Sequence, residues 1–180
     1  SPTTAADVRA DLGDDVDLIL DGGACQVGVE STIVDCTGDQ VVLLRPGGVP
    51  VEVLEGVLGA PVRRQAGPGA PAAPGTLAAH YAPRARVVVA ATVEEALDRA
   101  TAAVGRTGVL LPRTAVVPPG VTLLVAADDP TGYARALYAS LRRADQLGLE
   151  LVIAVPPPET GIGAAVADRL RRAAAAAQGA

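Results

Sequence analysis

Four stretches of the 180-residue sequence carry polar side chains in patterns that could bind a ligand, and three of the four also contain glycine. In the first, Val-Glu-Ser-Thr-Ile-Val-Asp at 29–35, a strand would alternate its faces, so Ser31 could present its hydroxyl to a small polar ligand. In the second, Leu-Arg-Pro-Gly-Gly at 44–48, Arg45 suits an anion, because a guanidinium binds phosphate or carboxylate through two N–H groups and glycine lets the backbone approach. An ordinary half-buried strand and a solvated arginine before a turn would explain the same residues.

The third stretch places the only histidine of the chain beside a tyrosine. Within 74–83, a Pro-Gly pair is followed by His80 and Tyr81, and loop residues are more often functional than core residues. A structural anchor for a linker is the alternative. The fourth stretch, Thr-Gly-Ile-Gly-Ala-Ala at 160–165, could bind phosphate at the start of a helix. It departs from the GxGxxG pattern because Val166 takes the last position, and a tight turn into a helix would also explain it.

The first 60 residues predict a mixed α and β segment that would position the first two stretches. Ser1, which is followed by proline, is expected to cap a helix that ends before Gly13. A Thr-Gly-Asp turn at 37–39 joins two runs rich in valine, which is typical of a β-hairpin. We expect a helix over 5–12, strands over 16–20, 26–35 and 41–45, and a helix over 50–58.

The composition changes after this segment. Residues 67–75 are almost all glycine, alanine and proline, so they favour a linker over a helix or a central strand. Beyond them, apolar runs alternate with helical patterns, which indicates a mostly parallel sheet covered on both faces, in a small Rossmann-like α/β domain. Strands are expected over 86–91, 108–111, 121–125 and 151–155, and helices over 92–104, 129–147 and 163–177. The expected division is a first domain over 1–60, a linker over 61–84 and a second domain over 85–180.

Composition and charge narrow the class of protein. The chain is 49% hydrophobic and 19% charged, which is typical of a globular protein, and its net charge of -5 argues against a general nucleic-acid binder. Because no run of about 18 apolar residues and no signal peptide is visible, we expect a soluble cytoplasmic protein that does not contact a membrane. Cys25 and Cys36 are expected to be reduced and half-buried in strands, and no metal site is evident. The helical arginines are expected on solvated faces: Arg142, Arg143, Arg169, Arg171 and Arg172.

Taken together, the order and spacing of these stretches resemble the Sua5 branch of the YrdC/Sua5 family, the threonylcarbamoyl-AMP synthases. The resemblance extends over nearly the whole chain. It implies an α/β protein with a partial YrdC-like α+β domain, a Gly/Pro/Ala linker and a Rossmann-like Sua5 domain. The residues that carry it are Ser1 to Thr3, Leu18 to Gly23, Gly28 to Asp35, Leu44 to Gly48, Pro74 and Gly75, His80 to Pro83, Tyr133 and Ala134, Leu137, Tyr138, Leu141, Arg142, Asp145, Gly161 to Ala165, and Asp168 to Leu170.

The resemblance implies a nucleotidyltransferase, an L-threonylcarbamoyladenylate synthase. Members of the family combine L-threonine, bicarbonate and ATP, with Mg2+ accompanying the ATP, and release pyrophosphate. The product supplies the t6A modification of tRNA at adenosine 37. The downstream t6A transferase machinery is therefore an implied partner, and a contact with tRNA or double-stranded RNA is left open. Such chemistry depends mainly on positioning and on neutralising charge.

The resemblance also implies roles for particular residues. The linker that carries the tyrosine would act as a lid over the nucleotide. No catalytic residue and no metal ligand is assigned. The assignments are Ser31 for L-threonine, Ser1, Arg45 and Tyr81 for ATP, and Thr32 and His80 as supporting residues behind them.

The sequence departs from the family in two ways. The family's Lys-x-Arg and Ser-x-Asn motifs would lie before Ser1, so we expect a C-terminal fragment that lacks the N-terminal part of the YrdC-like domain and is inactive alone. Residues 76–79 are not basic, unlike in many members, so they receive no charge role. The alternative is a non-catalytic module that senses a nucleotide or binds a partner or RNA, although the acidic balance weighs against RNA.

Overall fold

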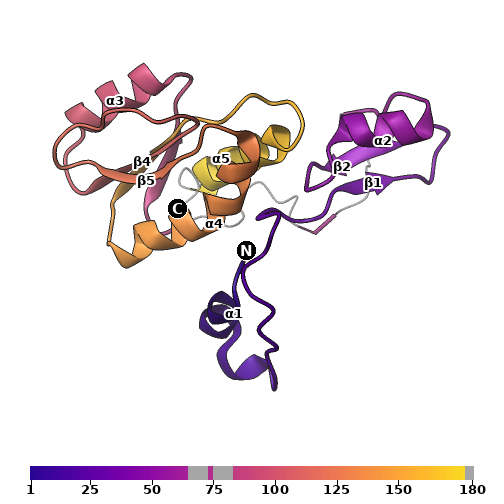
Figure 1. The fold of residues 1–180 in the computed structure, drawn as a ribbon, viewed down its shortest axis with the longest axis horizontal. Coiled ribbons are helices and arrows are strands. Elements are labelled where there is room, and N and C mark those ends of the chain that lie inside the picture. The colour runs from indigo at the N-terminus through magenta and orange to yellow at the C-terminus, as the bar shows by residue number, and fades with distance from the viewer. Residues whose placement is uncertain (65–72, 75–82, 177–180) are drawn as a thin grey trace.

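The computed structural model describes residues 1–64, 73–74 and 83–176. His80, Tyr81 and most of the glycine-rich stretch lie outside the described residues. The described chain is a mixed α/β fold, as expected from the sequence. Three parts can be followed in Figure 1: a helical segment at the N-terminus, a hairpin with one helix, and a larger half built on a parallel sheet.

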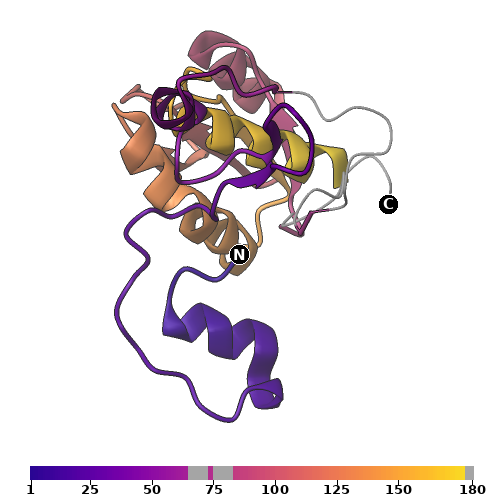
Figure 2. The same cartoon turned by 90° about the vertical axis from the view of Figure 1, so that its right-hand side faces the viewer.

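The N-terminal segment consists of α1 (Ala5–Leu12) and a short 3-10 turn, η1 (Gly13–Asp15). Its cap is Thr4 rather than Ser1, so the predicted cap is wrong. The Asp7 N–H donates to Thr4 Oγ1 at 3.1 Å, and the Thr4 N–H donates to the Asp7 carboxylate at 3.0 Å, which completes a reciprocal capping box. α1 buries none of its own residues and stands apart from the sheet in both views (Figure 1, Figure 2).

The strand predicted over 16–20 is wrong, because these residues form an irregular loop. Leu18 and Leu20 are 72% and 85% exposed, and no strand among the described residues pairs with them. A strand needs a neighbour that completes its backbone hydrogen bonds and covers one of its faces. Without such a neighbour, an apolar run alone does not produce a strand.

The predicted hairpin is confirmed, although its strands are shorter than expected. β1 (Ile33–Asp35) and β2 (Val42–Arg45) pair antiparallel, with Ile33 opposite Arg45 and a register shift directly after Ile33. Residues 26–32, which were expected to extend the first strand, lie outside it. This segment instead forms a loop, and its contacts build the candidate site.

α2 (Val51–Leu58) lies beside the hairpin and follows the prediction (Figure 1). It begins after Pro50 and ends at Gly59, whose φ of 65° is the left-handed conformation that glycine adopts at helix ends. Beyond the helix, Arg63 forms an isolated parallel bridge with Val42 of β2. The chain therefore returns to the hairpin before it leaves the described residues.

The larger half alternates strands and helices, as predicted. The elements are β3 (Arg86–Val89), α3 (Val93–Ala102), β4 (Thr107–Leu111), β5 (Thr122–Ala126), α4 (Pro130–Gln146), β6 (Leu151–Ala154) and α5 (Gly163–Ala176). The four strands are all parallel and lie in the order β3-β6-β4-β5. No helix in the described ranges is long and apolar enough to cross a bilayer.

Helices cover both faces of this sheet, which confirms the expectation from its continuous apolar runs. Alternate residues of β4 point to opposite sides. Leu110 is buried in a cluster with Leu137 of α4 and with residues of α5, whereas Val109 and Leu111 are buried with Val93 of α3. Figure 1 shows α3 and α4 on opposite sides of the sheet.

One face of α4 joins the larger half to the N-terminal residues. Arg135, Tyr138 and Arg142 are spaced by three and four residues, so they lie on one side of the helix. The Arg135 Nε donates to the Gln26 carbonyl at 2.6 Å, and the Arg142 Nη1 donates to Asp11 Oδ1 of α1 at 2.8 Å. The predicted solvated face is therefore wrong for Arg142, which anchors α1 to the larger half.

Candidate functional site

The loops on either side of the hairpin are bonded to each other. Thr32 Oγ1 donates to the Val49 carbonyl at 2.6 Å and accepts from the Val49 N–H at 3.1 Å. The Gly48 N–H donates to the Glu30 carbonyl at 2.8 Å. The segment around Ser31 is therefore fixed by the loop that follows β2, while the supporting role of Thr32 stays a prediction.

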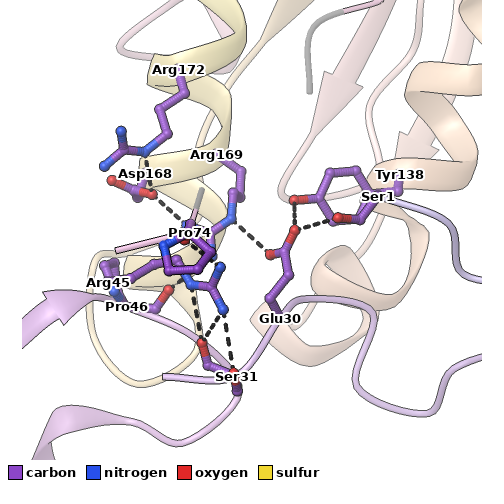
Figure 3. Close-up of polar contacts among 10 residues, drawn as sticks. All are labelled: Ser1, Glu30, Ser31, Arg45, Pro46, Pro74, Tyr138, Asp168, Arg169 and Arg172. Carbon is purple, nitrogen blue, oxygen red and sulfur yellow. Dashed lines mark hydrogen bonds and ion pairs between the residues drawn. The ribbon is translucent and has the colours of Figure 1, made fainter. Parts of the chain in front are cut away.

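Arg45 brings the two loops and a described residue of the linker together, as Figure 3 shows. The residue is only 6% exposed, so the reading as a solvated arginine is wrong. Its Nε and Nη2 donate to the Ser31 carbonyl at 3.2 and 2.9 Å, and its Nη2 lies 3.3 Å from Ser31 Oγ. Its Nη1 donates to the Pro74 carbonyl at 2.7 Å. The fold thus places Arg45 and Ser31 together, while their ligand roles stay predictions.

Ser31 is exposed although its backbone is tightly held. A Cβ added to Gly47 would lie 2.3 Å from the Ser31 carbonyl carbon and 2.4 Å from the Glu30 carbonyl oxygen. Only glycine at 47 lets the two loops approach this closely. A fixed backbone that carries an exposed hydroxyl can orient a small polar ligand, because little freedom is left to lose on binding.

Glu30 is the centre of the polar network, and sequence reasoning did not single it out. Its Oε1 accepts hydrogen bonds from Ser1 Oγ at 2.6 Å and from the Tyr138 hydroxyl at 2.7 Å, and its Oε2 accepts from Arg169 Nε at 2.9 Å (Figure 3). Burial by itself raises the pKa of this carboxyl. The hydrogen bonds from Ser1 and Tyr138 and the charge of Arg169 outweigh that effect, so the pKa falls from 4.5 to about 2. One feature of the sequence could have indicated this role. Glu30 is an acidic residue inside the mostly apolar run 27–34, where a buried charge needs a partner.

Arg169 of α5 supplies that partner, so the predicted solvated face is wrong for this residue. Its side chain is 1% exposed, its Nη2 donates to the Pro46 carbonyl at 3.0 Å, and its Nη1 donates to Asp168. Asp168 also accepts from Arg172 Nε at 2.9 Å. Helical spacing could have revealed this inward position. The buried residues of the same face are Ala165, Val166, Leu170 and Ala173.

Two cavities border Ser1 and Tyr138. One has a volume of about 310 Å³ and lies between residues 1–3 and the 28–30 segment. The other has a volume of about 270 Å³ and lies between α1 and α4, with Arg142 in its lining. Ser1 and Tyr138, which both bond to Glu30, therefore line two cavities that a small molecule could enter.

Residues 160–163 form a tight turn into α5. The sequence left open either such a turn or a phosphate-binding site at the start of the helix. The Gly163 N–H donates to the Thr160 carbonyl at 3.1 Å, and the Ala165 N–H donates to the Ile162 carbonyl at 3.0 Å. These amides therefore bond within the turn. A Cβ on Gly163 would lie 2.0 Å from the carbonyl oxygen of the preceding loop, which explains the glycine without a phosphate.

The described residues contain no group of three or more His, Cys, Asp or Glu side chains that could hold a metal ion. Cys25 and Cys36 are free but exposed, so the expectation of half-buried strand cysteines is wrong, and neither residue lies in a strand.

Fold and site define an α/β protein in which a Rossmann-like half is bonded to a loop that presents a serine hydroxyl. A family model described as threonylcarbamoyl-AMP synthase, C-terminal domain, matches residues 49–175. A second, described as Telomere recombination, matches residues 1–47. Because the first match spans more than half of the chain, the chain belongs to the threonylcarbamoyl-AMP synthase C-terminal domain family, as the resemblance predicted. The domain limits 1–60, 61–84 and 85–180 stay a prediction.

Relatives of established name agree with this family. The chain is 34% identical over 185 residues to a threonylcarbamoyl-AMP synthase of Pyrococcus abyssi, covering 96% of the chain and 54% of that protein. It is 34% identical over 191 residues to one of Bacillus subtilis, covering 97% and 53%. A crystal structure of P. abyssi Sua5 complexed with L-threonine is similar with a TM-score of 0.82 at 34% identity, covering 98% of this chain and 55% of that one. The chain therefore spans about half the length of the relatives it matches.

Proposed function

We propose that these residues belong to an L-threonylcarbamoyladenylate synthase, and that the segment 30–32 forms part of its L-threonine site. The observation that carries the proposal is the Arg45 guanidinium, which is buried and bonded to the Ser31 carbonyl. It holds an exposed serine hydroxyl at a fixed place. The likeness to a structure described as complexed with L-threonine supports the choice of ligand.

The proposed reaction needs no redox partner. The amino group of L-threonine attacks bicarbonate or CO2 to give a carbamate, and water leaves when bicarbonate is used. A carbamate oxygen then attacks the α-phosphorus of ATP, the bond to the β-phosphate oxygen breaks, and pyrophosphate leaves. Both steps join species that carry or develop negative charge. The enzyme therefore lowers the activation barrier mainly by positioning the reactants and neutralising their charge. ATP enters as its Mg2+ complex, and the metal is a component of that substrate.

The residue roles follow the resemblance to the family, and the contacts of Ser31, Thr32 and Arg45 support them. Ser31 contacts L-threonine through its hydroxyl, and Thr32 fixes the loop behind it through both of its bonds to Val49. Arg45 positions Ser31, and we assign it to the ATP side together with Ser1 and Tyr81. Tyr81 and His80 lie outside the described residues, and His80 is assigned a supporting role behind the site.

The wider setting of the proposed enzyme is the cytoplasm, where ATP, bicarbonate and tRNA are available. Its product would pass to the downstream t6A transferase machinery for modification of adenosine 37. A direct tRNA contact is not part of the proposal, because the net charge of -5 disfavours a phosphate backbone as ligand.

The test is pyrophosphate release from ATP by the product of the complete open reading frame that encodes these residues. We expect release only when L-threonine and bicarbonate are both present, and no stimulation by D-threonine. Ser31→Ala should raise the KM for L-threonine at least about tenfold, which corresponds to the loss of one good hydrogen bond. Release that is independent of L-threonine, or nucleotide binding without any turnover, would favour the non-catalytic module instead.

A further inference from the structure

The larger half reaches the candidate L-threonine site through two side chains that bond to one carboxylate. Tyr138 of α4 donates to Glu30 Oε1 at 2.7 Å, and Arg169 of α5 donates to Glu30 Oε2 at 2.9 Å. Glu30 directly precedes Ser31 in the chain. The two oxygens of one carboxylate are thus held from two different helices of the other half (Figure 3).

The same arginine also reaches the second loop. Its Nη2 donates to the Pro46 carbonyl at 3.0 Å, and Pro46 directly follows Arg45. Because a guanidinium is planar and rigid, one group fixes Glu30 and Pro46 relative to each other, which a single ammonium on a flexible stem does not do. Asp168 fixes the guanidinium in turn by accepting from its Nη1.

Stability alone is a poor explanation for such an arrangement. Replacing a buried ion pair by apolar side chains of similar volume is often neutral or stabilising, since desolvation offsets most of the attraction. Glu30 and Arg169 have side chains that are only 16% and 1% exposed. A pair of this kind is best explained by the geometry that it imposes on its neighbours.

We infer that Arg169 and Tyr138 are positioning residues of the active site: Tyr138 acts on the L-threonine side through Glu30, and Arg169 acts on both the L-threonine and the ATP sides. The inference deepens the proposed function and rests on it. It gives the Rossmann-like half a part in substrate affinity, which is exerted through Glu30 and Pro46.

The kinetic test compares three variants of the complete gene product. Tyr138→Phe removes the hydroxyl that donates to Glu30 Oε1, so it should raise the KM for L-threonine at least about fivefold and raise the KM for ATP less. Arg169→Lys keeps the charge but loses the double contact, so it should raise both KM values. Arg171→Ala is the matched control on α5, because Arg171 is half exposed and pairs with Glu159 on the surface. It should change neither KM.

Thermal midpoints of the same variants separate positioning from anchoring. A variant that lowers the midpoint but leaves both KM values within twofold of the unaltered protein is a structural anchor only, and that result overturns the inference. Tyr138→Phe that raises both KM values alike also overturns it. The test uses Arg169→Lys and not Arg169→Ala, so its result does not depend on whether the alanine variant folds.

A readout that needs no activity keeps this inference distinct from the proposed function. The Gly48 N–H is bonded to the Glu30 carbonyl, so its hydrogen exchange reports whether the two loops stay together. In the 180-residue chain we expect Arg169→Lys to speed this exchange at least about tenfold and Arg171→Ala to leave it unchanged. Unchanged exchange in Arg169→Lys overturns the inference, whereas absence of threonine-dependent turnover in the unaltered protein overturns the proposed function.

Discussion

Tyr133 and Tyr138 lie on the same helix, and their hydroxyl groups meet opposite surroundings. The Tyr133 hydroxyl is buried and has no hydrogen-bond partner among the residues that the structure describes, and burial raises its pKa. The Tyr138 hydroxyl donates to an ionised carboxylate. A buried polar atom without a partner costs about 1–3 kcal/mol, whereas a hydrogen bond to a charged group contributes about 1.5–3 kcal/mol.

We therefore expect Tyr133→Phe and Tyr138→Phe to change stability in opposite directions. Tyr133→Phe should raise the free energy of unfolding by about 1 kcal/mol, because it removes only an unsatisfied group. Tyr138→Phe should lower it by about 1–2 kcal/mol. Urea denaturation of the 180-residue chain measures both. A loss of stability in Tyr133→Phe would show that its hydroxyl has a partner.

The bond from Arg45 to the Ser31 carbonyl can be tested without altering net charge. Arg45→Lys keeps a cation but cannot reproduce the paired contact of Nε and Nη2. We expect the dissociation constant for L-threonine, measured by calorimetry on the complete gene product, to rise about tenfold. Arg64→Lys is the control, since Arg64 is half exposed and pairs with Glu52. Equal affinity in both variants would remove Arg45 from the proposed site.

At the scale of elements, Gly28 decides how closely the 26–32 loop approaches α4. Its φ is 81°, and an added Cβ would lie 2.4 Å from the Ala134 carbonyl oxygen and 2.4 Å from the Arg135 Cα. A backbone atom of a packed helix cannot move aside as the end of a side chain can. The loop can therefore pack this closely against α4 only with glycine at position 28.

Gly28→Ala should destabilise the chain by about 2 kcal/mol or more, through backbone strain and through the clash with α4. Gly23→Ala separates these causes, because Gly23 has a φ of 87° with nothing within 4 Å of an added Cβ. It should cost only about 1 kcal/mol. Thermal denaturation of both variants checks the difference. Equal losses would mean that the loop does not pack on α4 in solution.

At the scale of the whole molecule, the Glu30 carboxylate links stability to pH. Its pKa is lowered from 4.5 to about 2 in the folded chain, so folding favours the ionised form. The stabilisation is fully present above the unfolded pKa of 4.5 and is lost as pH falls through 2. A shift of this size corresponds to at most about 3 kcal/mol.

Glu30→Gln should therefore be less stable than the unaltered chain at pH 6, by up to about 3 kcal/mol, and the difference should narrow as pH falls from 5 toward 2. Urea denaturation at several pH values measures it. Asp7 and Asp11 have lowered pKa values of their own, through hydrogen bonds with Thr3 and Arg142 respectively, so only the difference between the two proteins is informative. A difference that does not vary with pH would contradict the network around Glu30.

Much of the fold could be predicted because its signals are local. The turn at 37–39 predicted the hairpin, and apolar runs between helical patterns predicted a sheet covered on both faces. Ser1 was predicted as the cap of α1, but Thr4 caps this helix through its reciprocal bonds with Asp7. The strand predicted over 16–20 was wrong because a strand also needs a neighbouring strand to pair with. The residues of the run do not show whether such a neighbour exists.

The sequence by itself determined the family, the hairpin, the Rossmann-like half and the candidates Ser31 and Arg45, since each rests on neighbouring residues or on the order of motifs. The tertiary structure alone decided that Glu30 meets Arg169, 139 residues further on, and that Arg45 bonds to the Ser31 backbone. The physical reason is that the sequence around a charged residue does not show which distant residue it will pair with. Only the packing of α4 and α5 against the 26–32 loop brings the two charges within reach, and burial then makes the pairing obligatory.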